Sequence, residues 1–356
     1  MNKVKNSASK MMQPLLAIVV GLIVGAIAMV LAGESVLNTY HEMWKGAFGN
    51  FYFFTSTLER SIPIILAGLG VAFAFRAGFF NLGAEGQLVL GAVTTAIVVV
   101  YLPFTGVIAI IIAIFSGMVI AGLWSFFAGW MEQRFQINLL ISTLLLNYIA
   151  VLFAGYLVSE PFRDTSSAGG VPQSVMINDA VKLPALFEGT NLHMGFIFAV
   201  VATIILAFII KRTTFGYEVR MLGQNRFFAQ YGGINRKKVM FTSMLISGML
   251  AGLGGGVEVL GMHYRFIEGA LTTPQFAWTG LMAALLANSN PIGTAVMAIF
   301  LAALDTGSLG VERNTDVPNA ISDIIQAVLI IFISARFTFT FLKLKKKEGK
   351  KHGKSI

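Results

Sequence analysis

Long apolar stretches joined by short polar connections constrain this chain more than any other feature of its sequence. Most of them reach the roughly 20 residues that a helix needs to cross a hydrocarbon layer about 30 Å thick, whereas a transmembrane barrel would show short alternating segments. Hydrophobic residues make up 56% of the chain and charged residues only 12%. We therefore expect an all-α polytopic membrane protein with about ten helices. The candidate spans are 12–32, 59–75, 84–101, 105–129, 137–158, 192–210, 240–260, 276–289, 291–310 and 319–341.

The distribution of charge assigns an orientation to these spans. Three lysines precede the first span, and basic residues favour the cytoplasmic side of a membrane. Counting spans then places the loop 159–191 outside and the loop 211–239 inside, and an even number of spans returns the basic tail 343–356 to the cytoplasm. We interpret residues 1–32 as a retained first helix rather than a cleaved signal peptide, because the apolar run is long and lacks a small-x-small exit. Residues 1–342 are expected to form one transmembrane domain.

The loop 211–239, called the basic loop below, is the longest polar connection with a strong positive bias. Its basic residues outnumber its single acidic residue, Glu218, and they are Lys211, Arg212, Arg220, Arg226, Arg236, Lys237 and Lys238. A short helix is expected inside it, because Asn225 is suited to cap a helix start and the two glycines that follow Tyr231 are suited to end one. Phe227, Phe228 and Tyr231 fall on one face of this helix. Such a helix presents an aromatic knob to a groove in another protein.

Residues 76–91 interrupt the apolar pattern with four glycines and with Asn81, Glu85 and Gln87, although no proper loop is present. Non-helical backbone at membrane depth survives only when it is buried in protein or lines a wet cavity. The segment is therefore interpreted as a broken or re-entrant helix near the core of the bundle. The alternative is a tight cytoplasmic turn over 76–82.

Polar and aromatic side chains on otherwise apolar helices are the candidates for a solute path. For the polar residues of 138–148 the alternative is a role in helix packing, which small polar residues often have. For aromatic residues the alternative is the belt that forms at membrane interfaces. The residues assigned to the path are Phe79, Phe80, Asn81, Glu85, Gln87, Asn147, Tyr148 and Trp278.

Several kinds of chemistry are absent from the sequence. No phosphate-binding Gly-x-x-x-x-Gly-Lys-Ser/Thr loop occurs, so any ATP must be hydrolysed by another chain. The chain has no cysteine, and its four histidines lack a partner at ligand spacing, so no catalytic residue, metal ligand or cofactor is expected in it. The net charge of +9 is concentrated next to spans, where orientation and anionic lipid explain it better than nucleic acid does.

Three segments also carry a family resemblance: 75–87 (FRAGFFNLGAEGQ), 142–150 (STLLLNYIA) and 223–234 (GQNRFFAQYGGI). Together they resemble the permeases of ABC importers for ribose, branched-chain amino acids and nucleosides, and most closely the larger permease of nucleoside importers of the guanosine type. The resemblance covers the whole chain in order and spacing. One departure follows residues 273–276, where Ala277 and Trp278 replace the glycine and acidic residue of other members.

The resemblance implies a type II ABC transmembrane domain in a bacterial cytoplasmic membrane. It implies that the basic loop docks on an ATPase subunit, which binds the ATP and magnesium. It further implies a second, homologous permease, an extracytoplasmic solute-binding lipoprotein or periplasmic protein, and a neutral polar solute of the nucleoside class. The residues that it assigns to ATPase coupling are Gly223, Asn225, Phe227, Phe228, Ala229, Tyr231, Gly232 and Gly233.

Two alternatives remain open at the level of the sequence. One is an ABC permease for a pentose. The other is a secondary transporter driven by an ion gradient, which would use ionisable residues within its spans and has no evident use for the basic loop. The residues available to it are Glu59, Glu85, Glu258, Asp305 and Asp323, of which only Glu85 and Asp323 are expected to lie deep.

Overall fold

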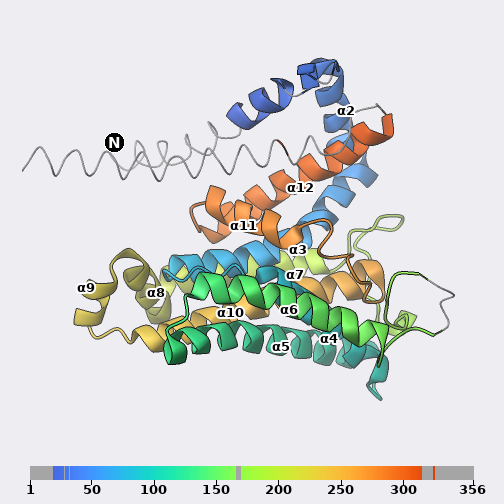
Figure 1. The fold of residues 1–356 in the computed structure, drawn as a ribbon. Helices are drawn as coiled ribbons and strands as arrows, with labels where there is room; N and C mark the ends of the chain where they lie inside the picture. The colour runs from blue at the N-terminus through green and yellow to red at the C-terminus, as the bar shows by residue number, and fades with distance from the viewer. Residues whose placement is uncertain (1–18, 28, 32, 166–169, 315–323, 325–356) are drawn as a thin grey trace, which may run out of the picture. The chain divides into compact units, whose positions relative to one another are not determined.

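The computed structural model describes residues 19–27, 29–31, 33–165, 170–314 and 324, and within these ranges it is helical with no strand (Figure 1). Seven of the described helices are long and apolar enough to cross a membrane, which confirms the predicted class. The predicted span 319–341, the tail 343–356 and the start of the first span lie outside the described residues. The long helices are α3 (Phe51–Arg76), α4 (Ala84–Tyr101), α5 (Gly106–Phe135), α6 (Leu139–Ser159), α7 (Gly195–Arg212), α10 (Arg236–Glu258, extended by a π-turn, Val259–His263) and α12 (Pro291–Asn314).

The chain divides into two compact units. The smaller unit comprises 1–49 and 303–356, and in it α2 (Val36–Phe48) packs so closely on the end of α12 that a Cβ atom on Gly46 would lie 2.8 Å from the Cα atom of Gly310. The larger unit comprises 50–302 and holds all helices from α3 to α11. It contains every candidate site residue.

Helix α10 is the central helix of the larger unit, and it packs on α3, α4 and α5. Its closest contacts are made through glycines. A Cβ atom on Gly252 would lie 2.8 Å from the carbonyl oxygen of Gly117 in α5, and one on Gly255 would lie 2.0 Å from that of Leu88 in α4. Small residues let helix backbones approach each other, which is how helices in lipid gain packing energy without a hydrophobic effect between them.

The connections of the larger unit gather at two opposite ends (Figure 1). At one end, residues 160–194 meet the start of α3 through Phe187 and Phe51, whose rings lie 5.2 Å apart, and they meet the end of α10 through a bond from Leu183 N to Leu260 O. At the other end lie the basic loop, with α8 (Thr214–Gln224) and α9 (Arg226–Tyr231), and the turn between α3 and α4. The predicted separation of 159–191 from 211–239 is thus present in the fold.

Several boundaries differ from the sequence prediction, and two of these differences have a local cause. Helix α3 begins at Phe51 rather than near 59, because Asn50 accepts a hydrogen bond from Phe53 N and caps it. The predicted span 276–289 is wrong in length: α11 (Phe276–Leu286) has eleven residues, about 16 Å of helix, which is roughly half a membrane. Left-handed residues border it on both sides, with φ values of 56° at Gln275 and 51° at Asn288.

Candidate functional site

The interruption predicted over 76–91 is confined to residues 77–83, called the interhelical turn below. The turn lies beside the basic loop, since a Cβ atom on Gly223 would be 2.1 Å from the carbonyl oxygen of Arg76. It is also recessed. Asn81 donates to Ser247 Oγ at 2.9 Å, and Ser247 is eleven residues, or about 16 Å, into α10. The structure therefore combines both interpretations: a turn at the end of the bundle that dips into its interior.

Asn81 is the centre of the polar network that holds this turn. Its side chain is fully buried, and its amide group donates to Gln87 Oε1 at 3.1 Å as well as to Ser247. Its carbonyl oxygen accepts from Gly83 N at 2.9 Å and from Gln87 Nε2 at 3.1 Å. Both polar atoms are thus satisfied within the protein, as buried polar groups require.

Asn147 completes the network from α6. Its carbonyl oxygen accepts from Gly86 N at 2.9 Å, and its amide donates to Leu82 O at 2.8 Å. Thr143, one turn earlier, accepts from Leu82 N at 3.2 Å. These side chains replace the helical hydrogen bonds that the turn lacks. In this conformation Asn81, Gln87 and Asn147 are buried and bonded to the turn or to one another. Their assignment to the solute path stays a prediction.

The aromatic path candidates have different surroundings. Phe79 is buried, with the Arg236 guanidinium 5.5 Å from its ring centroid. Phe80 is 56% exposed and contacts Phe75, whereas Tyr148 is 66% exposed on the outer face of α6. In the described structure, Tyr148 does not share a binding surface with the interhelical turn.

Glu85 and Trp278 form the pair among the path candidates that remains partly accessible. The Trp278 indole Nε1 donates to the Glu85 carboxylate at 3.2 Å, which joins α4 to α11. A small pocket beside the pair is lined by Val71, Asn81, Leu82, Ala84, Ala277 and Leu281 as well. The pair combines an aromatic face with a hydrogen-bond acceptor, the two features that bind a flat polar solute.

Glu59, His193 and Glu258 form a buried cluster that the sequence did not reveal. Their ligand atoms lie within 4.8 Å of one another, and each side chain is less than a tenth exposed. Glu258 is the last residue of α10, as expected of a position near a span end, but both glutamates are buried in the protein. No sequence signal links the three residues, because they are far apart in the chain.

The geometry of His193 argues against a metal centre in this cluster. Its Nδ1 accepts a hydrogen bond from Gly195 N at 3.1 Å. The pKa of His193 is lowered to about 4, mainly because the side chain is buried and secondly because His263 is nearby. A neutral ring that accepts at Nδ1 carries its proton on Nε2, which then has no lone pair for a metal. We interpret the cluster as a polar contact between α3, α10 and the start of α7.

Helix α9 has the construction that its sequence predicts. Asn225 Oδ1 accepts from Phe228 N at 3.0 Å, which confirms the cap, and Gly233 adopts a φ of +82° just beyond the helix, which confirms the stop. Ala229 is buried and fixes the helix to the loop. The aromatic residues point away from the protein, and the exposed fractions are 74% for Phe227, 63% for Phe228 and 94% for Tyr231. Apolar side chains this exposed indicate a contact surface.

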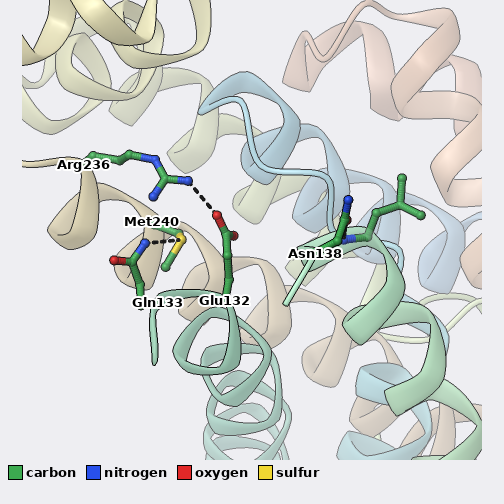
Figure 2. A network of polar contacts seen from close by, with 6 residues as sticks. Glu132, Gln133, Asn138, Arg236 and Met240 are labelled. Atoms are coloured by element: carbon green, nitrogen blue, oxygen red, sulfur yellow. Dashed lines mark hydrogen bonds and ion pairs between the residues drawn. The ribbon is translucent and has the colours of Figure 1, made fainter. Parts of the chain in front are cut away.

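A cavity of about 730 Å³ opens between α9, the interhelical turn and the facing ends of α5 and α6. Figure 2 shows its polar network: Arg236 at the start of α10 pairs with Glu132 at 2.6 Å, and Gln133 donates to Met240 Sδ at 3.7 Å. Asn138 caps α6 by accepting from Leu140 N at 2.9 Å. This space, called the basic cavity below, was not predicted as a site.

Comparison with known proteins gives a consistent result. Residues 53–334 match the family described as branched-chain amino acid transport system / permease component. The chain is 37% identical to the guanosine ABC transporter permease protein NupP of Bacillus subtilis, over 95% of this chain and 98% of that one. It is 31% identical to the glucose ABC transporter permease protein TsgB13 of Haloferax volcanii (90% and 86%), and 29% identical to the nucleoside ABC transporter permease protein NupB of Lactococcus lactis (96% and 95%).

Proposed function

Since the chain belongs to the family of branched-chain amino acid transport permease components, we propose that it is the membrane-spanning subunit of an ABC importer that carries a nucleoside. Its helical fold fits a polytopic permease of type II, and its role is transport rather than catalysis. The observation that carries the proposal is α9, a capped helix whose three aromatic side chains are exposed. An ATPase that receives this helix in a groove can move it when nucleotide binds.

The nucleoside is proposed because two relatives that span nearly all of this chain are named for guanosine and nucleoside transport. Trp278 and Glu85 offer a stacking surface and an acceptor for such a solute. A sugar is the second candidate, because the Haloferax volcanii relative is named for glucose. Uptake of labelled guanosine, adenosine, ribose and glucose by cells that express the importer separates the two.

The same proposal includes three protein partners. The ATPase occupies the α9 side, and a solute-binding protein delivers the solute at the opposite end, over residues 160–194. A second, homologous permease completes the transmembrane path. The basic loop and both termini are then cytoplasmic, in a bacterial cytoplasmic membrane.

Impermeant thiol labelling tests this orientation. Asn191→Cys, at an exposed position of the 160–194 connection, is expected to react from outside intact cells, whereas Gln230→Cys, exposed on α9, is expected to react only after the membrane is opened. Ser174 is unsuitable as a probe although it lies in the same connection, because it is buried and bonded to Phe266. Reaction of Gln230→Cys in intact cells would reverse the orientation.

Glu85→Gln separates an ABC importer from an ion-coupled carrier. Glutamine keeps an oxygen that accepts the Trp278 N–H, so ATP-dependent uptake is expected to survive with a loss of at most a few fold. A proton-coupled carrier would lose its titrating group and stop. The measurement is uptake by proteoliposomes with ATP alone and with an ion gradient alone. Accumulation in the second condition, abolished by Glu85→Gln, would contradict the ABC function.

A further inference from the structure

The basic cavity is lined by cations and by apolar and amide groups. Arg226, Arg236 and Lys237 supply the cations, and Glu132, which pairs with Arg236, is the acidic residue among the lining residues. Neither Arg226 nor Lys237 has an ionic partner among the described parts of the chain. The cavity therefore has a net positive charge that the protein itself leaves unbalanced.

The apolar part of the lining continues onto the membrane-facing surface. Leu140 lines the cavity and is 40% exposed, and Phe80, which also lines it, is exposed as well. From Leu140 an exposed stripe follows one face of α6 at helical spacing, through Ile141, Leu145, Tyr148 and Leu152. A cationic cavity that opens onto an apolar stripe along a spanning helix is complementary to an amphiphile with an anionic headgroup.

We propose that the basic cavity binds the headgroup of an anionic phospholipid, with an acyl chain along the exposed face of α6. The phosphate lies between Arg226 and Lys237, and the amides of Gln133 and Asn138 are placed to donate to headgroup oxygens. Because Arg226 is the first residue of α9, the bound lipid joins this helix to the ends of α5 and α6.

A lipid fits this space better than an acidic segment of a protein partner. The exposed aromatic residues Phe227, Phe228 and Tyr231 are not among the lining residues, so the contact surface of α9 faces away from the cavity. Apart from Arg226, the lining residues come from the ends of spanning helices, from the α5–α6 connection and from the interhelical turn. The proposal depends on the chain spanning a membrane and not on the identity of the solute.

The test is retention of phosphatidylglycerol by the full-length permease in its assembled complex, measured by native mass spectrometry during exchange into phosphatidylcholine nanodiscs. The wild type is expected to retain phosphatidylglycerol in preference to phosphatidylcholine. The double variant Arg226→Gln/Lys237→Gln is expected to lose this preference by roughly 30-fold, since two basic contacts are removed. Lys237→Arg is expected to keep it.

Lys238→Gln is the matched control, because Lys238 is the next residue of the same helix, is exposed and does not line the cavity. Equal loss in Lys238→Gln and in the double variant would overturn the proposal, because it would show a general surface-charge effect. Displacement of phosphatidylglycerol by millimolar inorganic phosphate would show a simple anion site and would also overturn it. So would protection of Lys237→Cys by the ATPase with no lipid retained, since the occupant would then be the protein partner.

Discussion

Phe227→Asp/Phe228→Asp is expected to abolish ATP-dependent uptake while leaving the amount of permease in the membrane unchanged. Both side chains are largely exposed, so their replacement removes no packing from the permease itself. The two carboxylates would enter the groove that we propose receives α9, where an aromatic anchor typically contributes about 2 kcal/mol or more to binding, or roughly 30-fold in affinity. Co-purification of the ATPase and uptake in proteoliposomes measure the effect.

Gln230→Asp is the matched control for this variant. It places one carboxylate on the same short helix at an exposed position that is already polar. We expect it to retain most of the uptake. Normal uptake and a normal ATPase stoichiometry in the double aspartate variant would exclude α9 as the coupling contact, whatever the control shows.

Gly255→Ala is expected to lower the thermal midpoint of the larger unit strongly. The new Cβ atom would lie 2.0 Å from the carbonyl oxygen of Leu88 and 2.8 Å from the amide nitrogen of Ala92, and neither backbone atom can move without separating α4 from α10. Overpacking in a core typically destabilises a protein by about 1–3 kcal/mol, and contact with backbone lies at the upper end or beyond. Fluorescence-detected size-exclusion chromatography after graded heating is the measurement.

The neighbouring Gly254→Ala is the control, because its nearest atom is the Leu66 side-chain Cβ at 3.3 Å, which small adjustments can accommodate. Its thermal midpoint is expected to stay within a few degrees of the wild type. Comparable folding of both variants would mean that α4 and α10 are not packed as closely as the structure has them.

The parts of the fold that the sequence predicts are those set by local signals. Helix α9 follows from a capping asparagine, a glycine pair and six residues between them, so its bounds and exposed face were foreseeable. The length of α11 was not, because its ends depend on left-handed turns at Gln275 and Asn288 whose residue types do not require that conformation.

The roles of the polar residues in the candidate site were likewise not predictable from local sequence signals. The unusual placement of Asn81 and Asn147 in an apolar part of the chain was visible, but whether they face a solute or the backbone of a turn depends on which helices lie opposite. The contact of Glu59 with Glu258 and His193 joins three separate elements, and nothing in the chain near any of them indicates the other two. Contacts between distant elements depend on how the helices pack, and no periodic pattern in a single sequence reports them.

The contact of Gly223 with the carbonyl of Arg76 has a mechanical consequence. Where long side chains separate two elements, a displacement of one is partly absorbed by rotamer changes before it reaches the other. Here backbone meets backbone, and the adjoining turn is fixed by Asn81 to α10 and by Asn147 to α6. Close-packed protein has low compressibility. A displacement of the end of α8 would therefore be transmitted to the α3–α4 hairpin with little loss of amplitude.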